Sequence, residues 1–521
     1  MDERRSRRLF IIIAFGIPFL VTCLVSHLVF GGIPHVQDSI AQVFQGKIFA
    51  SGRLYAQSHP LKEFFDYTHM INNGRWYSQY PPGHSLFLVF GVLLGLPWLV
   101  NPLLGSLAVL LVYFLGRRLY DEKTGRWAAI FTMLSPFFIF MSSEFMSHSS
   151  AMFTFVVFAF CFFQVIRTRK KHWALFAGLF LGLCMLTRPY TAFGLVIPFV
   201  LYALVLLYRK PKEHFSLLAS VLAALVPSVV FLLLYNYYTN GAPLRFGYTV
   251  LYGPAHGLGL GKGIWDEPHT LARGLADLWD SIRALNTHFL GWPVVTFLPI
   301  LVLLASGKAL ATDYLLLASF ASLAGIHVLY WYHDLCLGPR FLYEALPFLV
   351  ILTVRGLSIT PHFFKERLGF RRMNVAQAGR VVVGTVVVLF LYDVFITIPG
   401  LIRGKSDYFW TDRQYANSYW GVDAYLENLV KRQQLANAIV FVDFDYPAIR
   451  LDSLLWYGSG FLNNSPALQD NIIYARHRGS CDTLLMNYYP DRKYYIYQGK
   501  LQMGGVFEIG KGSFSAPGAS R

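Results

Sequence analysis

Near its N-terminus the chain carries an uninterrupted apolar run, residues 9–31, which reads LFIIIAFGIPFLVTCLVSHLVFG. A helix rises about 1.5 Å per residue, so about 20 such residues cross the hydrocarbon core of a bilayer. The arginines Arg4, Arg5, Arg7 and Arg8 directly precede the run. It is too long for the apolar part of a signal peptide, and no convincing cleavage site follows. The run therefore predicts an uncleaved first membrane-spanning helix.

The composition of the whole chain extends this interpretation. Of the 521 residues, 55% are hydrophobic and only 14% are charged, against roughly 25% charged in soluble proteins. Lipid must therefore solvate much of the surface. The formal net charge is +16, but the basic residues cluster in short loops between apolar runs. This pattern favours membrane topology and anionic headgroups, and we expect no nucleic-acid partner.

Further apolar runs extend the count to about eleven spans, which predicts a polytopic α-helical membrane protein. The candidates after 9–31 are 98–118, 126–143, 147–166, 173–187, 190–208, 214–236, 288–305, 313–332, 341–356 and 380–399. The apolar stretch 84–95 is only half a span long and ends at Gly95-Leu96-Pro97. It predicts a half-helix or re-entrant piece; a full span there would invert everything downstream.

Basic clusters decide between these two topologies, because Lys and Arg gather on the cytoplasmic side. With eleven spans the clusters at 4–8, 117–126, 167–171, 209–212 and 355–380 all lie inside. The inverted topology would place three of them outside. We therefore expect a protein of the cytoplasmic membrane with its N-terminus inside and its C-terminus outside.

Residues 1–400 form the predicted membrane domain, and its large outside loops span 32–83 and 238–287. Residues 401–521 are polar enough to fold in water and form a predicted extracytoplasmic domain. This segment contains strand-like runs at 438–442 and 494–497 and helical patterning around 413–435. We expect a small α/β domain. By eye the chain shows no internal repeat, which weakens a transporter interpretation.

Ionisable residues are dense in the first outside loop, from His35 and Asp38 to His84. Asp38 opens a segment whose apolar residues follow helical spacing as far as Gly52. This predicts an amphipathic helix that lies on the bilayer, with Gly52 near its C-terminal cap. Asp38 is either a carboxylate held at the membrane surface or only the N-cap of that helix. The spacing does not separate these alternatives.

Farther along, the chain reads Gly74-Arg75-Trp76-Tyr77-Ser78-Gln79-Tyr80-Pro81-Pro82-Gly83-His84. Tandem proline and glycine enforce an irregular backbone, which is tolerated at the membrane only against protein or a wet cavity. Arg75 and His84 flank this element. The alternative is a simple turn with two surface cations.

Together these elements resemble the GT-C superfamily of membrane glycosyltransferases, in particular the protein O-mannosyltransferase and lipid A aminoarabinose transferase type. Asp38 after the first span, Gly52-Arg53-Leu54-Tyr55 and the Arg75 to Gly83 element carry the resemblance. Further matching motifs are Gly116-Arg117-Arg118-Leu119-Tyr120, Thr187-Arg188-Pro189 and Gly338-Pro339-Arg340-Phe341-Leu342-Tyr343-Glu344-Ala345-Leu346-Pro347. The resemblance covers most of residues 1–400.

The resemblance implies an inverting transfer of a sugar from a polyprenyl-phosphate donor to an acceptor hydroxyl on the outer face. The acceptor would be a glycan, a lipid or a protein. Asp38 matches the position of the general base. Many relatives carry Asp-Glu here, whereas this chain has Asp38-Ser39, which leaves a divalent metal possible but not indicated. In the second outside loop Glu144 or His148 matches a further acidic position.

Fixed cations at the outer surface are needed to stabilise the phosphate leaving group, and arginine matches phosphate geometry. Arg188 lies in a very short outside loop, and Arg340 lies at the outside entry of a span. Both arginines lie on the outer side of the membrane, whereas basic topology signals lie on the cytoplasmic side. The alternative to donor-phosphate binding is that each arginine only binds lipid headgroups. Arg75 is the third candidate. Possible accessory residues are His35, His84, Glu144, His148, Arg245 and Lys262.

Two motifs in the outside segments suggest nucleotide chemistry only superficially. The glycines at 257, 259, 261 and 263 do not follow a strand or fit the P-loop pattern. With nearby aromatics they suggest a mobile cover over a sugar or prenyl chain. Val442-Asp443-Phe444-Asp445 resembles the acidic motif of nucleotide-sugar transferases, which need a larger soluble domain, so a strand ending in an acidic turn is favoured. The rival functions are a transporter or flippase, or a ligase, for a lipid-linked glycan.

Overall fold

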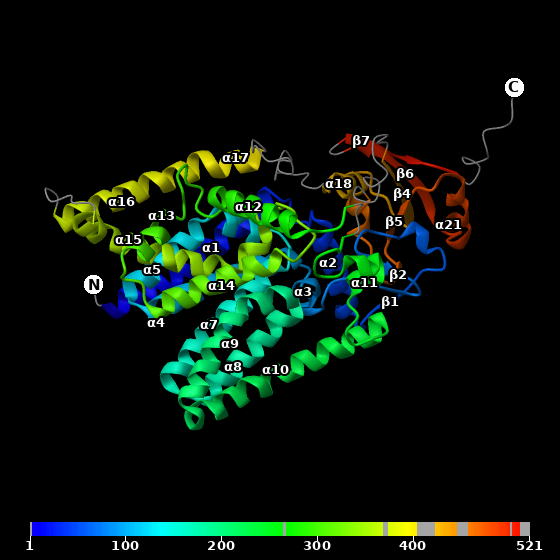
Figure 1. Cartoon of the computed structure of the whole chain (residues 1–521). Coiled ribbons are helices and arrows are strands. Elements are labelled where there is room, and N and C mark those ends of the chain that lie inside the picture. The colour runs from blue at the N-terminus through cyan, green and yellow to red at the C-terminus, as the bar shows by residue number, and fades with distance from the viewer. Residues whose placement is uncertain are drawn as a thin grey trace. The chain divides into compact units, whose positions relative to one another are not determined.

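The structure is a computed structural model that describes residues 3–263, 267–367, 374–403, 422–444, 457–500 and 503–510. The chain divides into two compact units, and Figure 1 labels most of their helices and strands. The helical unit comprises Met1–Val25, Asn101–Leu234 and Pro254–Asp412, and the mixed unit comprises Ser26–Val100, Tyr235–Gly253 and Arg413–Arg521. The prediction divided the chain at residue 400. In the structure most of the first outside loop belongs to the same unit as the C-terminal segment.

The helical unit consists almost entirely of apolar helices, three of which (α1, α4 and α10) run on into the mixed unit. In chain order its elements are α1 (Glu3–Leu28), α4 (Val100–Leu119), α5 (Glu122–Leu134), α6 (Pro136–Ser143), α7 (His148–Thr168), α8 (Lys171–Thr187), α9 (Pro189–Arg209), α10 (Pro211–Asn240), η3 (Pro254–His256), α12 (Leu271–His288), α13 (Leu298–Ala305), α14 (Ala311–His327), η4 (Arg340–Ala345), α15 (Leu346–Arg367), α16 (Val375–Tyr392), the π-helical turn η5 (Asp393–Thr397) and α17 (Ile398–Arg403).

Local sequence sets the ends and the packing of these helices. The Asp121 side chain accepts a hydrogen bond from the backbone N–H of Thr124 at 2.7 Å and so caps α5, as N-cap carboxylates do. Ser135 and the following proline start α6, which is bent by 62° from α5. Gly178 on α8 lies so close to α10 that an added Cβ would be 2.0 Å from the Val221 carbonyl oxygen. Small residues of this kind let helix backbones meet where lipid supplies no hydrophobic drive.

Seven helices in the described residues are long and apolar enough to cross a membrane, or eight if the bent pair α5–α6 counts as one span. The prediction of a polytopic helical membrane protein is therefore confirmed, but the expected number of about eleven exceeds this count. Helix α8 is apolar but has only 17 residues. The predicted span 288–305 is not a continuous helix, because α12 ends at His288 and α13 begins only at Leu298. Gly291, at φ +65°, and Pro293 interrupt it.

The mixed unit combines the first outside loop, a short segment after α10 and the C-terminal region. Its elements are α2 (Gln37–Ala50), β1 (Ala56–Gln57), η1 (Lys62–Phe64), β2 (Met70–Asn72), β3 (Arg75–Ser78), α3 (Gly83–Leu93), η2 (Pro97–Leu99), α11 (Gly247–Tyr252), α18 (Tyr425–Arg432), β4 (Ala438–Phe444), α20 (Gly458–Phe461), β5 (Ile472–Arg476), η7 (Gly479–Cys481), α21 (Asp482–Tyr488), β6 (Lys493–Lys500) and β7 (Met503–Glu508). Helix α3 has 11 residues, which confirms that 84–95 is not a full span.

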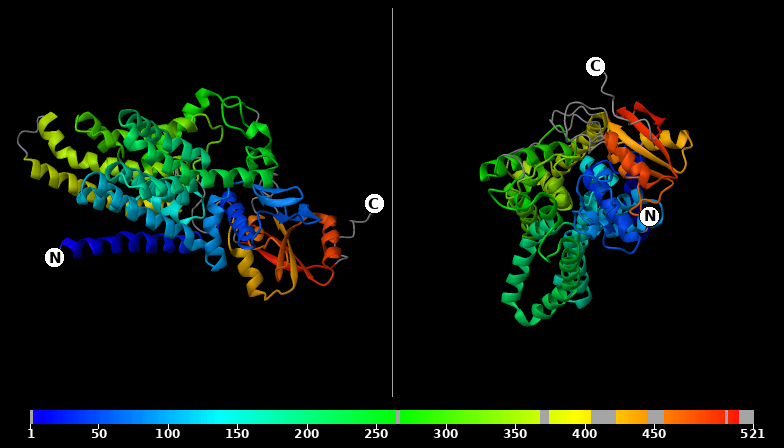
Figure 2. Two further views of the ribbon diagram at one scale, coloured as in Figure 1. Left: turned by 90° about the horizontal axis from the view of Figure 1, so that it is seen from below. Right: turned by 90° about the vertical axis from the view of Figure 1, so that its right-hand side faces the viewer.

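Two sheets organise the mixed unit, and the larger one is visible in orange and red in Figure 2. The smaller sheet has the antiparallel order β1-β3-β2. In the larger, ordered β5-β4-β6-β7, strand β4 runs parallel to both β5 and β6, and β7 is antiparallel to β6. The predicted strands at 438–442 and 494–497 and the α/β character of this region are confirmed. Asp445 and residues 413–421 of the predicted helical pattern lie outside the described residues.

Helix α2 corrects one expectation, because it does not lie on the bilayer. Ten of its 14 residues are buried and none is exposed. The Phe44 ring lies 4.5 Å from that of Trp76 and 4.9 Å from that of Phe461, between ring centroids. Lys47 Nζ donates to the carbonyl oxygens of Leu462 at 2.6 Å and Asn464 at 2.9 Å. The apolar side chains, whose spacing suggested a stripe that faces lipid, instead pack against protein on both sides of the helix.

Candidate functional site

Asp38 is the second residue of α2, and its carboxylate lies among polar partners. The N-cap of α2 is Val36, without a side-chain capping bond, so Asp38 is not the N-cap. Asp38 Oδ1 lies 3.4 Å from His69 Nε2, and the Asp38 side chain is 16% exposed. The structure thus favours the carboxylate interpretation over the capping one.

Tyrosine hydroxyls surround this carboxylate. Tyr80 forms a side-chain hydrogen bond with Asp38, and burial followed by the charge of Asp38 raises the pKa of Tyr80 well above its usual value. The same two causes, burial first, raise the pKa of Tyr67 and bring the pKa of Tyr252 to about 12. These phenols are therefore protonated at neutral pH. They can donate hydrogen bonds to an anion or a sugar oxygen.

The short helix α11 packs onto the strand end beside Asp38. An added Cβ on Gly247 would lie 2.4 Å from the Gln79 carbonyl oxygen, so the two backbones are in direct contact. The Tyr248 ring centroid is 5.6 Å from that of Tyr80. The Tyr252 hydroxyl is 2.9 Å from His69 Nδ1. A segment predicted to belong to the outside loop 238–287 thus covers the surroundings of Asp38.

Arg75 and Arg245 lie on the same side of this unit, beside Tyr77. Both side chains are exposed, and the Arg75 guanidinium is 5.0 Å from the Tyr55 ring centroid. Burial raises the pKa of Tyr77 to about 12, while the charges of Arg75 and Arg245 oppose that rise. Among the described residues no carboxylate lies within 4.0 Å of either arginine. They form a locally uncompensated pair of cations.

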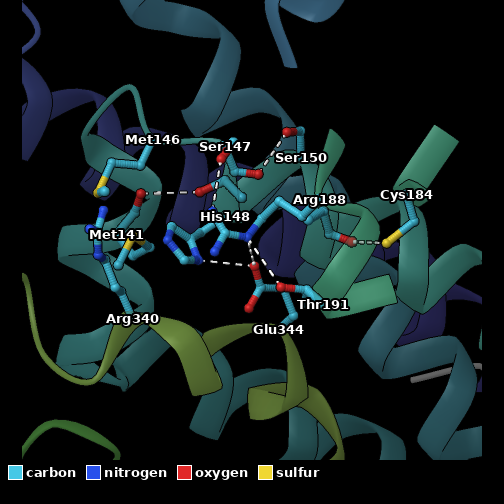
Figure 3. A network of polar contacts seen from close by, with 12 residues as sticks. Met141, Met146, Ser147, His148, Ser150, Cys184, Arg188, Thr191, Arg340 and Glu344 are labelled. Carbon is cyan, nitrogen blue, oxygen red and sulfur yellow. Dashed lines mark hydrogen bonds and ion pairs between the residues drawn. The ribbon is translucent and has the colours of Figure 1, made fainter. Parts of the chain in front are cut away.

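Arg188 belongs to the helical unit, where it forms part of a buried network that Figure 3 shows from close by. Its Nε lies 3.1 Å from Glu344 Oε1, and Glu344 is fully buried. His148 Nδ1 is 2.9 Å from the same oxygen. Arg188 Nη1 also donates to Ser147 Oγ at 3.2 Å. The predicted residues Arg188 and His148 therefore meet at one carboxylate, between α7, the start of α9 and η4.

Arg340 forms a second compensated pair in the same unit. Its Nε and Nη2 donate to the two carboxylate oxygens of Asp334 at 2.7 and 2.6 Å, and both side chains are buried. The Phe341 ring lies 5.0 Å from the Arg340 guanidinium and 5.8 Å from that of Arg188. One aromatic ring therefore contacts both arginines, which brings the two predicted residues together around it.

The remaining predicted accessory residues are scattered. In the mixed unit His35 Nε2 lies 2.7 Å from the Phe30 carbonyl oxygen, and His84 is buried in the first turn of α3. In the helical unit Glu144 is fully buried, and its backbone oxygen accepts from Asn101 Nδ2. The Lys262 carbonyl oxygen accepts from the His269 backbone N–H at 2.9 Å. Within the part of the chain that the structure describes, no group of three or more His, Cys, Asp or Glu residues could hold a metal ion.

Comparison with known proteins places this geometry in a family context. Residues 85–232 match the family model described as dolichyl-phosphate-mannose-protein mannosyltransferase. ArnT from Cupriavidus metallidurans bound to undecaprenyl phosphate matches with a TM-score of 0.57 and 12% identity, over 99% of this chain and 100% of that chain. Its apo state matches with a TM-score of 0.54 and 13% identity over the same shares. The predicted resemblance is confirmed. Residues 85–232 therefore resemble this mannosyltransferase family, and the whole chain has the fold of ArnT.

More distant likenesses add nothing to this assignment. The archaeal oligosaccharyltransferase AglB from Archaeoglobus fulgidus, in complex with an inhibitory peptide and a dolichol-phosphate, has a TM-score of 0.46 and 11% identity, over 95% of this chain and 70% of that chain. That score is too low to support an argument. No curated protein matches the chain in sequence. At this identity the ArnT match establishes the fold of the chain and leaves its activity and substrates open.

Sequence reasoning missed His69, Asp334 and Glu344 as partners of the candidate site residues. His69 stands in an ordinary loop and reaches Asp38 only through the β2–β3 pairing. Glu344 and Asp334 did carry a signal, since each is an acidic residue close to the apolar run 341–356. Charged residues at such positions are costly and need a partner. Each lies within ten residues of Arg340, so the pairing of Asp334 with Arg340 was open to prediction.

Proposed function

We propose that the chain transfers a sugar from a polyprenyl-phosphate donor to an acceptor hydroxyl at the outer face of the cytoplasmic membrane, with inversion at the anomeric carbon. The donor lies in the bilayer, so the reaction needs no nucleotide at the site. The membrane topology expected from the basic clusters, with the N-terminus inside and the C-terminus outside, puts the mixed unit on that face. The family match of residues 85–232 and the ArnT fold support this class of donor.

The observation that carries the proposal is the environment of Asp38. A single carboxylate directly after the first span is held by His69 and Tyr80. As general base it takes the proton of the acceptor hydroxyl while the acceptor oxygen bonds to the anomeric carbon. The bond from that carbon to the phosphate oxygen breaks, and its electron pair leaves with the polyprenyl phosphate.

The leaving phosphate needs fixed cations. Arg75 is the strongest of the three predicted arginines for this role, because it is exposed and uncompensated and has Arg245 near it. Arg188 and Arg340 remain candidates, but each already neutralises a carboxylate. Each can reach a phosphate only with guanidinium N–H groups that its carboxylate does not use.

The test is native mass spectrometry of the lipids that co-purify with the wild type, Asp38→Asn and the exposed control Asp491→Asn, combined with transfer assays on the same samples. We expect a polyprenyl-phosphate monosaccharide on all three proteins and loss of transfer only for Asp38→Asn. A large lipid-linked oligosaccharide on the wild type would favour a ligase. Absence of any prenyl phosphate would favour a transporter, and an active Asp38→Asn would overturn the assignment of the base.

A further inference from the structure

His69 contacts Asp38 with one ring nitrogen and two side-chain partners with the other. Its Nε2 faces Asp38 Oδ1 at 3.4 Å. Its Nδ1 lies 2.8 Å from Gln79 Nε2 and 2.9 Å from the Tyr252 hydroxyl. Gln79 follows β3 and Tyr252 ends α11, so the ring links the first outside loop to the segment after α10.

These partners fix the tautomer of the imidazole. An amide nitrogen donates hydrogen bonds and has no lone pair with which to accept one. With the Gln79 amide oriented as it is here, Nδ1 accepts from Gln79 Nε2; the Tyr252 hydroxyl lies 2.9 Å from the same nitrogen, whose single lone pair takes only one full hydrogen bond. This arrangement assigns the ring proton to Nε2, which faces Asp38 Oδ1 at 3.4 Å. In a neutral histidine the bond made by one nitrogen decides the state of the other.

The backbone of His69 is also specialised. Its φ is +64°, in the left-handed region that few residues other than glycine adopt. The His69 carbonyl oxygen accepts from the Gln79 backbone N–H at 3.0 Å, next to the Met70–Ser78 pair of the β2–β3 ladder. Strain of this kind costs about 1–3 kcal/mol and tends to persist at functional sites. Here the positive φ directs the imidazole ring of His69, just before β2, toward the Asp38 carboxylate.

We propose that His69 is the positioning residue of the base: its Nε2 faces Oδ1 of Asp38 and orients the carboxylate toward the acceptor hydroxyl. Tyr252 contacts the opposite ring nitrogen and so helps to hold the imidazole in this position. The packing of α11 is therefore one of the conditions under which Asp38 can act as the general base. This inference rests on the proposed function, because it assumes that Asp38 is the base.

Several described groups interact with Asp38, and the test must separate them. His69 pairs with it, Tyr80 is hydrogen-bonded to it, and Tyr67 and Tyr252 respond to its charge. Tyr80 keeps its contact when His69 or Tyr252 is changed. Variants at His69 and Tyr252 therefore test the contact between His69 and Asp38.

The experiment compares His69→Leu, His69→Gln and Tyr252→Phe with the wild type and with the exposed control Tyr488→Phe. Leu and Gln carry a similar backbone penalty at positive φ, but only Gln offers a side-chain N–H near the position of Nε2. For each variant kcat, the donor KM and the pH dependence of kcat are measured. Thermal unfolding and donor binding by native mass spectrometry show whether the variant folds.

We expect His69→Leu to lower kcat about 100-fold and Tyr252→Phe about 5- to 10-fold, with the donor KM changed less than about twofold. The acid limb of the pH profile moves to higher pH in His69→Leu, because the ionised carboxylate has lost a donor. His69→Gln recovers part of both effects. If His69→Leu does not fold, Tyr252→Phe, which keeps its ring, carries the test.

Two results would contradict the inference alone: unchanged kcat and pH profile in Tyr252→Phe and in a folded His69→Leu, or a lower kcat with no shift of the profile and no recovery by Gln. The proposed function fails separately, if Asp38→Asn remains active. The two failures are therefore distinguishable in one set of proteins.

Discussion

Glu344 Oε1 lies 3.1 Å from Arg188 Nε, and the Glu344 side chain is fully buried. The arginine that the sequence suggested for phosphate binding is thus neutralised by a carboxylate on η4. His148 shares the same oxygen. The pair therefore stabilises the packing of the helical unit, whether or not Arg188 also binds the donor phosphate. Stability and activity of its variants must be measured separately.

Breaking this pair from one side should be costly. Removal of one partner of a buried ion pair leaves an uncompensated charge and costs about 3–5 kcal/mol, whereas replacement of both by apolar groups is often neutral. We expect Arg188→Met and Glu344→Leu each to lower the unfolding temperature strongly, and the double variant to recover much of the loss. Thermal unfolding in detergent measures this.

Transfer activity of the same double variant decides the role of Arg188. If the arginine only packs, activity returns with stability. If it also contacts the donor phosphate, the double variant is stable but has a raised donor KM. A double variant that is no more stable than the single ones would contradict the buried-pair argument.

Arg75 should contribute to donor binding. Arg75→Ala removes one of two cations that no described carboxylate compensates, so we expect the donor KM to rise about 10-fold, with a smaller effect for Arg75→Lys. Initial rates at varied donor concentration measure it. The control is the exposed Arg432→Ala on α18. Equal effects of the two alanine variants on the donor KM would show that the overall positive charge of the protein, and not Arg75 itself, promotes donor binding.

Gly247 should be required for the packing of α11. A Cβ there would be 2.4 Å from the Gln79 carbonyl oxygen, so Gly247→Ala must displace α11, and Tyr252 moves away from His69 with it. We expect kcat to fall about 10-fold or more. Gly384→Ala on α16 is the matched control, because nothing lies within 4 Å of its added Cβ. Normal activity of Gly247→Ala would show that α11 is dispensable.

Lys47 predicts a pH dependence of stability. Burial is the main cause that lowers its pKa from 10.5 to about 8. Between these values the unfolded chain binds more protons than the folded one, so stability rises as pH increases from about 8 to about 10.5. The gain relative to Lys47→Met is at most about 3 kcal/mol. It is absent below pH 8, where the lysine is charged in both states.

Unfolding temperatures of the wild type and Lys47→Met at several pH values between 7.5 and 10 measure this difference. The exposed Lys493→Met should follow the wild type over the whole range. A constant gap between wild type and Lys47→Met would mean that Lys47 titrates alike in both states.

Much of the membrane architecture could be predicted, because a span leaves a local signal. About 20 apolar residues in succession seldom occur outside a membrane-spanning helix, and α1, α7, α9 and α10 lie where such runs stand. The failure at 288–305 has a local cause, because Gly291 and Pro293 break a run whose mean hydropathy alone suggested a helix. The burial of α2 had no such signal, since an apolar stripe looks the same against lipid as against protein.

The amino-acid sequence alone predicted the polytopic membrane class and the strands of the C-terminal region. It also predicted Asp38, Arg75, Arg188 and Arg340 as candidate site residues. Composition, apolar run length and the resemblance of short motifs suffice for these. Only the tertiary structure decided their partners: His69, Tyr80 and Tyr252 for Asp38, Glu344 for Arg188, and Asp334 for Arg340. The reason is physical. Hydrophobicity acts along a segment, whereas a hydrogen bond or ion pair depends on a few ångströms between atoms that chain folding alone brings together.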